Sequence, residues 1–276
     1  MLARGQHGYP KAFQLSLSDR GVNLMKKHLI AAASAALVLA GAAHASGDHH
    51  HASWSYGGET GPEAWGKLKS EYSACTGNQQ SPINIVAKQA LESDMTKIKF
   101  DWSDTALQVK NNGHTIQANY DEGSSIKVNG DKFDLLQFHF HSPSEHALNG
   151  KLYDMEAHFV HKADNGELAV VGVFFKEGKE NKALAPIWNN MPQHVETKDV
   201  AGIKINGEDL LPKDTKEYFH YMGSLTTPPC SEVVNWYVLA EPIEASKEQI
   251  EAFSEVIHAN NRPVQPLNRR FVLAND

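Results

Sequence analysis

Residues 137–146 of the chain read QFHFHSPSEH. His139 and His141 alternate with Phe138 and Phe140, and this period of two predicts a β-strand with one apolar face and one histidine-bearing face. Side chains two residues apart on a strand lie on the same face, about 6 to 7 Å from each other. The stretch therefore predicts a sheet strand that presents two imidazoles side by side.

A second stretch, residues 155–162, reads MEAHFVHK and alternates in the same way. An Asn-Gly dipeptide, a strong signal for chain reversal, lies between the two stretches at residues 149–150. Antiparallel pairing of the two strands would bring His158 beside His139 and His141. The fold and the histidine cluster thus follow from one pairing.

Three imidazoles on rigid strands, with no fourth protein ligand, are typical of a catalytic zinc site that keeps one open position. A metal-bound histidine usually donates its second ring N–H to an acceptor. Gln137 and Glu156, each two residues before a histidine, are placed for that task. A single strand histidine would usually be structural, but the combined pattern predicts metal ligands at His139, His141 and His158.

A histidine pair followed by a glutamate is also typical of the cupin metal site. The cupin pattern requires glycines at two flanking positions, and this chain has Phe133 and Leu152 there. The sequence therefore argues against a cupin.

Further strands are predicted from period-two alternation and from one apolar run, LAVVGVFF, which indicates a strand buried on both faces. Asn-Gly dipeptides predict several hairpins and therefore an antiparallel or mixed sheet. The predicted strands include residues 98–102, 126–128, 136–140 and 168–175, and the dipeptides begin at Asn112, Asn129, Asn149, Asn165 and Asn206.

Helices are expected to be few. The stretch from Ser246 to Ala259 has an N-cap serine, and Gln249 completes a capping box ahead of an apolar stripe. A shorter helix is expected within residues 181–190. No internal repeat and no linker between domains is found.

The N-terminal part of the chain is expected to lie outside the fold. Residues 25–45 have the basic start, apolar run and small-residue site of a cleaved signal peptide, and the run is too short to span a membrane. We interpret residues 1–24 as an upstream extension that belongs to no domain, residues 46–53 as a flexible mature terminus, and residues 54–276 as the domain. Export to the periplasm or out of the cell is expected.

The formal net charge of −7 argues against nucleic acid or an anionic membrane as a partner and favours small molecules. The chain has two cysteines, Cys75 and Cys230, both in the part expected to be exported. An even count in an oxidising compartment favours a disulfide over two buried thiols. The sequence leaves open whether the chain forms a homodimer.

With these motifs in hand, the chain resembles an α-class carbonic anhydrase of the bacterial, exported kind. The resemblance extends from about residue 54 to about residue 272 and implies a single domain, mainly β with short peripheral helices, built on a large, mostly antiparallel twisted sheet. The matching segments, besides the two histidine strands, are SYGGETGPEAW from Ser55, QSPINI from Gln80, NNGH from Asn111, SLTTPP from Ser224, NWYVL from Asn235 and NNRPVQPLNRR from Asn260.

The resemblance implies reversible hydration of carbon dioxide to bicarbonate and a proton, by attack of zinc-bound hydroxide with a histidine proton shuttle and one Zn²⁺ per chain. Carbonic anhydrase is the reference case for zinc lowering the pKa of bound water to about 7. By position, His139, His141 and His158 match the ligands, and Gln137 and Glu156 match the acceptors behind them.

Other residues take roles from the same resemblance. Thr226 would accept a hydrogen bond from the hydroxide and donate one to Glu145, and Thr227 would contact bicarbonate. His114 matches the proton shuttle and Tyr56 a tyrosine that orders the water chain. The apolar wall for carbon dioxide matches Val160, Val170, Leu225 and Trp236.

His146 and His161 are assigned structural roles. The connection from His141 to Glu145 is shorter than in animal members and resembles bacterial ones. A disulfide between the two cysteines would hold the loop that carries Thr226.

Two other functions are weighed. An inactive binding domain of the same family usually lacks a zinc histidine, whereas all three are present. A periplasmic zinc-binding protein is suggested by His49, His50 and His51, and it predicts several labile metal ions per chain rather than one tightly held zinc.

Overall fold

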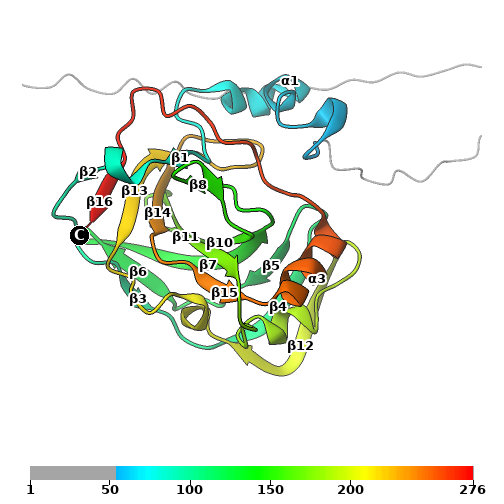
Figure 1. Cartoon of the computed structure of the whole chain (residues 1–276). Coiled ribbons are helices and arrows are strands. Elements are labelled where there is room, and N and C mark those ends of the chain that lie inside the picture. Colours follow the sequence, from blue (N-terminus) through cyan, green and yellow to red (C-terminus); the bar gives the residue numbers. More distant parts are fainter. Residues whose placement is uncertain (1–53, 276) are drawn as a thin grey trace, which may run out of the picture. The chain divides into compact units, whose positions relative to one another are not determined.

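The computed structural model describes residues 54–275, which fold around one large β-sheet (Figure 1). Within these residues the sheet has 13 strands, in the order β12-β4-β5-β7-β10-β11-β14-β13-β16-β2, with β15 beside β11 and the β3–β6 pair beside β7. The strands are β2 (Leu91–Glu92), β3 (Lys99–Asp101), β4 (Thr105–Asn111), β5 (Ile116–Asn119), β6 (Ser125–Val128), β7 (Asp131–His141), β10 (Met155–Lys162), β11 (Leu168–Glu177), β12 (Glu196–Ile205), β13 (Tyr218–Gly223), β14 (Val234–Leu239), β15 (Ile243–Ala245) and β16 (Leu273–Asn275).

The remaining elements are short. A second, three-stranded sheet is formed by β1, β8 and β9. These strands are β1 (Asn84–Ile85), β8 (Ala147–Leu148) and β9 (Lys151–Leu152); the α-helices are α1 (Trp65–Leu68), α2 (Ala185–Trp188) and α3 (Lys247–Ile257); and the 3-10 helices are η1 (Gly58–Thr60), η2 (Ser70–Thr76), η3 (Ala87–Gln89) and η4 (Gly207–Leu210).

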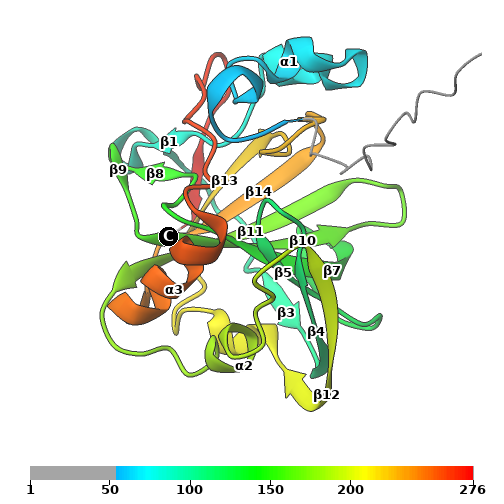
Figure 2. The same ribbon diagram turned by 90° about the vertical axis from the view of Figure 1, so that its right-hand side faces the viewer.

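Most neighbouring strands of the large sheet run antiparallel. The parallel pairs are β11 with β14, β11 with β15, and β16 with β2. The predicted fold class, mainly β with short helices on a mostly antiparallel sheet, is therefore confirmed. Figure 2 shows α2 and α3 close together at one end of the sheet, with α1 at the opposite end.

The predicted signal peptide at residues 25–45 lies outside the described residues, as do the extension at 1–24 and the terminus at 46–53. Within residues 54–275, no helix has both the length and the apolar character needed to cross a bilayer.

The central strand pair β7–β10 has the predicted antiparallel register. His139 lies opposite His158, and His141 lies opposite Glu156. Because directly opposed residues project to the same face, the histidines of the two strands converge. Phe138 and Phe159, each next to one of these histidines in the sequence, are paired on the other face of the sheet.

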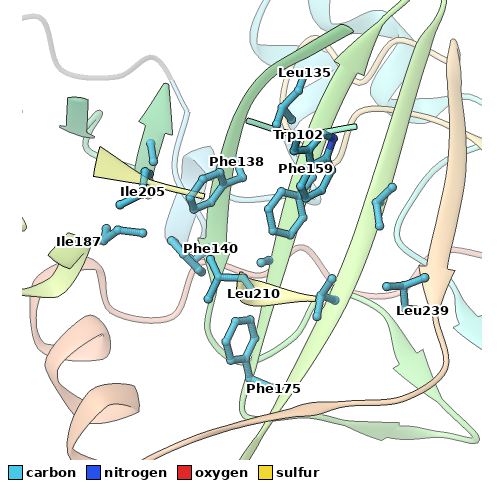
Figure 3. Close-up of a cluster of buried hydrophobic side chains, with 14 of the residues drawn as sticks. Trp102, Leu135, Phe138, Phe140, Phe159, Phe175, Ile187, Ile205, Leu210 and Leu239 are labelled. Carbon is cyan, nitrogen blue, oxygen red and sulfur yellow. The ribbon is translucent and has the colours of Figure 1, made fainter. Parts of the chain in front are cut away.

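Phe138, Phe140 and Phe159 anchor the two strands in a large apolar cluster (Figure 3). None of the three is exposed, and the rings of Phe138 and Phe159 lie 5.0 Å apart. Replacing one such buried phenylalanine by alanine typically costs about 3–5 kcal/mol of stability. The same alternation that buries the phenylalanines therefore aims the histidines at the opposite side of the sheet.

The apolar pattern breaks at Leu136. The prediction that Leu136 shares a face with Phe138 and Phe140 is wrong, because Leu136 is 44% exposed. The register with β10 shifts between Val160 and His161, so that β7 carries one extra residue at this point. Such a β-bulge reverses the alternation, and Leu136 turns toward solvent.

Strand β11 is buried on both faces from Ala169 to Phe175, as the continuous apolar run predicted. One face joins the cluster in Figure 3, and Val170 and Phe174 of the other face join a second cluster with Trp236. The sheet therefore separates two apolar layers, and the histidines lie on the side of the second.

Helix α3 begins as predicted. The Ser246 side chain accepts a hydrogen bond from the Gln249 backbone, and the Gln249 side chain reciprocates. Phe253 is buried and stacks on Trp188 of α2. Helix α2 itself, Ala185–Trp188, is shorter than the range predicted for it.

The Asn-Gly dipeptides at 112, 129, 149 and 165 join neighbouring strands, as predicted. Asn129 and Asn149 have positive φ, which asparagine tolerates better than most residues. The dipeptide at 206 is different: the Asn206 side chain accepts from the Glu208 backbone and begins η4. The expected hairpin is absent there because a local side-chain cap competes with strand pairing.

Candidate active site

Three imidazoles converge on one face of the central sheet. His139 and His141 come from β7, and His158 comes from β10. Each offers one nitrogen, and these atoms lie within 4.8 Å of one another. His141 and His158 are each only 1% exposed. This is the geometry of a three-histidine metal site.

Each imidazole is oriented by an acceptor on its far side. His139 Nδ1 lies 2.9 Å from Gln137 Oε1, and His158 Nε2 lies 2.9 Å from Glu156 Oε1. His141 Nδ1 lies 2.8 Å from the backbone oxygen of Asn260. Because an oxygen acceptor requires a protonated ring nitrogen, the other nitrogen of each ring keeps its lone pair free for a metal.

Burial keeps two of these rings neutral. It lowers the pKa of His139 well below its usual value, and the neighbouring His141 and His158 lower it further. Burial likewise lowers the pKa of His141, although the Glu145 carboxylate opposes the shift. A neutral imidazole is the form that binds a metal ion.

Two buried polar atoms at this centre lack a hydrogen-bond partner, His141 Nε2 and Glu145 Oε2. Leaving such atoms unpaired costs about 1–3 kcal/mol each. A cation between the histidines would satisfy His141 Nε2, and the all-nitrogen donor set suits zinc. The residues present therefore fit a Zn²⁺ ion held by His139, His141 and His158.

Glu156 is the hub of the surrounding hydrogen bonds. Its Oε2 accepts from the backbone N–H groups of Glu145 and His146, at 2.9 and 2.8 Å. Burial alone would raise its pKa, but the charges and hydrogen bonds of His146 and His158 lower it, so the carboxylate stays ionised. Gly172 makes room, since a Cβ there would lie 2.9 Å from Glu156 Oε1.

His146, Glu156 and His158 form a second group of possible ligand atoms. Both ring nitrogens of His146 are already engaged, Nδ1 at 2.7 Å from Glu156 and Nε2 at 2.7 Å from the Tyr221 hydroxyl. No lone pair remains for a metal. This group is therefore a hydrogen-bond network behind His158, in line with a structural role for His146.

Glu145 is fully buried beside the histidines. Its Oε1 accepts from the Arg262 backbone N–H at 2.8 Å, and Oε2 lies 3.6 Å from His141 Nε2 and 3.8 Å from His158 Nδ1. The predicted hydrogen bond from the Thr226 hydroxyl is not formed in this structure, where Oε2 has no hydrogen-bond partner.

The residues predicted to form an apolar wall lie together. Val160 of β10 is opposite Val170 of β11, and both contact the cluster that contains Trp236. The Trp236 ring lies 4.8 Å from that of His158. Leu225 packs against the same cluster, so the wall borders the three-histidine centre.

Thr226 and Thr227 lie in the loop between β13 and β14, which is tied at both ends. Trp236 Nε1 donates to the Ser224 oxygen at 3.0 Å, and the Cys230 backbone N–H donates to the Thr227 oxygen at 2.8 Å. The predicted disulfide between Cys75 and Cys230 is present. It ties this loop to η2.

His114 lies in the turn between β4 and β5 and stacks on Trp54, with ring centroids 3.7 Å apart. Tyr56 meets both rings edge-on. Burial lowers the pKa of His114. Burial raises the pKa of Tyr56 well above its usual value, and the negative charge of Glu145 raises it further.

Three residues of this site were not assigned roles from the sequence: Trp54, Asn260 and Arg262. The role of Trp54 could have been predicted from its position two residues before Tyr56. The other two act here through backbone atoms toward His141 and Glu145. Such contacts leave no side-chain pattern in a sequence.

Residues 60–276 match the family described as eukaryotic-type carbonic anhydrase. A carbonic anhydrase of Nostoc sp. is 47% identical over 225 residues, covering 80% of this chain and 85% of the relative. The solved structure of a hyperthermostable carbonic anhydrase from a hydrothermal vent chimney is 52% identical, with a TM-score of 0.78 over 81% of this chain and all of that one. The α-carbonic anhydrase of Thermovibrio ammonificans, solved with sulfanilamide, is 48% identical, with a TM-score of 0.77 over 80% of this chain and 98% of that one. With the same sheet, three inward histidines and similarity across most of its length, the chain belongs to the α-carbonic anhydrase family.

Proposed function

We propose that the protein hydrates carbon dioxide reversibly to bicarbonate and a proton in a zinc-dependent reaction. The observation that carries the proposal is the convergence of three imidazoles, two of them buried and one half-buried, each oriented by an acceptor, with His141 Nε2 unpaired at their centre. Membership of the carbonic anhydrase family supports the same reaction.

His139, His141 and His158 would hold the metal. When bound, Zn²⁺ supplies a Lewis acid that lowers the pKa of water to near neutrality, an effect for which carbonic anhydrases are the reference case. Three neutral ligands leave the full double charge of the ion in place. The ionised Glu156 stabilises the His158 side of the site through the 2.9 Å contact.

Substrate binding is assigned to the wall of Val160, Val170, Leu225 and Trp236. Carbon dioxide is small and carries no net charge, so apolar side chains beside His158 can bind it without hydrogen bonds. Burial at Val170 and Trp236, each 2% exposed, keeps that side of the site dry. Thr227, partly exposed in the same loop, would contact bicarbonate.

Glu145 and Thr226 are assigned to orienting the attacking oxygen. Glu145 is held by Arg262 through Oε1 and keeps Oε2 free as a buried acceptor. If the Thr226 hydroxyl donates its hydrogen bond to that acceptor, its oxygen can only accept a hydrogen bond from the nucleophile. This directional constraint would align the nucleophile with the substrate carbon.

His114 is assigned to removing the proton. Stacking on Trp54 leaves it half buried, and the lowered pKa keeps the ring neutral near neutral pH, with one nitrogen free to accept a proton. Such a group can accept a proton and release it to buffer. Tyr56, whose ring meets that of His114 edge-on, is assigned to ordering the water chain along which the proton would travel.

Export is also part of the proposal. The signal peptide at residues 25–45 would be removed and the catalytic domain would comprise residues 54–276. The disulfide between Cys75 and Cys230 supports an oxidising compartment. N-terminal sequencing of the protein from a periplasmic extract tests this, and an intact Met1 would contradict it.

The proposed reaction is tested by measuring zinc content and carbon dioxide hydration on the same purified preparation. One zinc per chain with hydration that is lost on chelation and restored by zinc is expected. One tightly held zinc without hydration would indicate an inactive binding domain. Several labile ions without hydration would indicate a zinc-buffering protein.

A further inference from the structure

Asn260 lies in the chain segment between α3 and β16 and is fully buried. Figure 1 shows that this segment runs as an irregular coil from the one element to the other. We propose that Asn260 is a positioning residue that holds the metal-binding His141 and the His114 turn in one common arrangement. The inference rests on the proposed function and assigns it a further residue.

One set of contacts joins Asn260 to the end of β7. Its backbone oxygen accepts from His141 Nδ1 at 2.8 Å. Its side-chain Oδ1 accepts from the Ser142 N–H at 2.8 Å, and its own N–H donates to the Ser142 oxygen at 3.2 Å. The reciprocal bonds with Ser142 hold the Asn260 oxygen against the His141 ring.

A second set joins the same side chain to the His114 turn. Nδ2 donates to the His114 oxygen at 2.9 Å and to the Phe140 oxygen at 3.0 Å. Phe140 directly precedes His141, so the amide group bridges the turn and the ligand strand. The Thr115 hydroxyl also bonds to the Phe140 oxygen, at 2.5 Å, and closes the base of the turn.

These contacts require an amide. Both Nδ2 protons and Oδ1 are engaged, and the backbone N–H and C=O are engaged as well. Aspartate has nearly the same shape, but it would place carboxylate oxygens against two carbonyl oxygens in a buried site. Serine could replace one contact at most. No other side chain supplies two donors and an acceptor in this space.

Because one rigid group binds both sides, a displacement of the amide affects both. His141 would lose its fixed orientation, and the His114 turn would lose its anchor. The turn has a second anchor that does not touch the ligand strand, the Asn112 side chain, whose Oδ1 accepts from the His114 and Thr115 N–H groups, each at 2.9 Å. Asn112 is therefore a matched control.

The test compares Asn260→Asp with Asn112→Ala. Zinc loss to a chelator measures the His141 side, and kcat in weak buffer, with and without added imidazole, measures the His114 side. Asn260→Asp should speed zinc loss by about tenfold or more, the effect typical of residues behind metal ligands. It should also lower kcat in weak buffer, with partial rescue by imidazole. Asn112→Ala should lower kcat in weak buffer and leave zinc loss unchanged.

The proposal is overturned if Asn260→Asp changes only the melting temperature, or if it changes one of the two readouts and not the other. Asn260→Ser serves as the second variant and should show both effects in the same direction. If neither variant folds, amide hydrogen exchange of the wild-type protein tests the proposal instead. Zinc removal should then speed exchange at residues 113–115 and leave the turn at Asn129 unchanged, and equal rates at 113–115 would refute the coupling.

Failure of the proposed function gives a different result. If the wild-type protein binds no stoichiometric zinc and does not hydrate carbon dioxide, the proposed function is wrong. If the wild-type protein binds zinc and hydrates carbon dioxide, and Asn260→Asp has the same rate of zinc loss and the same buffer dependence, only the role proposed for Asn260 is wrong.

Discussion

His158 and Glu156 stand two residues apart on β10, and their side chains meet, with Nε2 of the ring 2.9 Å from Oε1 of the carboxylate. The same carboxylate oxygen contacts His146, and its partner oxygen caps the backbone of residues 145 and 146. One strand therefore provides both a proposed metal ligand and the group that orients it. This pairing makes the metal site sensitive to single atoms of Glu156.

Glu156→Gln keeps the shape of the side chain but removes its charge. An amide can accept from only one oxygen, so the contacts to His146, His158 and the backbone cannot all be kept. Zinc affinity is expected to fall by about 10- to 100-fold. Competition with a chelator measures it, and an unchanged affinity would contradict the role given to Glu156.

His158→Ala removes a ligand rather than its support. Zinc and carbon dioxide hydration should be lost together, because two imidazoles leave the ion with too few protein donors. Metal analysis after gel filtration checks this. His194→Ala is the matched control, since His194 is exposed and does not belong to the histidine cluster. A full zinc equivalent in His158→Ala would refute the ligand assignment.

His114→Ala should retain zinc and reduce kcat mainly in weak buffer, with recovery on addition of imidazole. Because burial lowers the pKa of His114, its ring loses the proton below the usual pH of about 6.5. In the wild type, kcat in weak buffer should therefore reach half its maximum at a pH below 6.5. Trp54→Leu, which exposes the ring, should move that midpoint upward. Absence of imidazole rescue would exclude His114 from proton transfer.

His161 lies on the opposite face of β10, stacked on Trp102, and burial lowers its pKa to about 3. Between pH 6.5 and 3 the unfolded chain binds a proton that the folded protein does not. Stability therefore falls as the pH falls through this window, by up to about 5 kcal/mol from this group. His161→Gln should lose this part of the acid sensitivity.

Urea unfolding of the His161→Gln variant at pH 7 and pH 4 tests this prediction. Comparison with the wild type cancels the contributions of the carboxylates, which titrate in both proteins. His194→Gln, at an exposed position, should behave like the wild type. An equal loss of stability on acidification in wild type and His161→Gln would show that the ring is not held neutral.

Reduction of the disulfide between Cys75 and Cys230 should lower turnover before zinc is lost. The bond holds the loop of Thr226 and Thr227, whereas the proposed zinc ligands lie on strands that it does not touch. With a sequence separation of 155 between the cysteines, the chain-entropy model gives about 5 kcal/mol of stabilisation. Turnover, zinc content and melting temperature are measured with and without reductant, and unchanged turnover would refute the role in the loop.

Local patterns predicted the elements that carry the site. Alternation placed Phe138 and His139 on opposite faces of a strand, and the capping box of Ser246 placed the start of α3. Both patterns depend only on residues that lie a few positions apart in the sequence. The bulge at Leu136 escaped prediction because it depends on the register with β10, which local alternation does not report.

The sequence by itself determined the three histidines that face one another and the acceptors Gln137 and Glu156, because strand alternation decides which side chains share a face. Only the tertiary structure decided that Asn260 supports His141 across a separation of 119 residues, and that Arg262 holds Glu145 through its backbone N–H. Backbone groups are chemically alike at nearly every position. Which of them meets a functional side chain is therefore settled only when the sheet and the segment after α3 pack together.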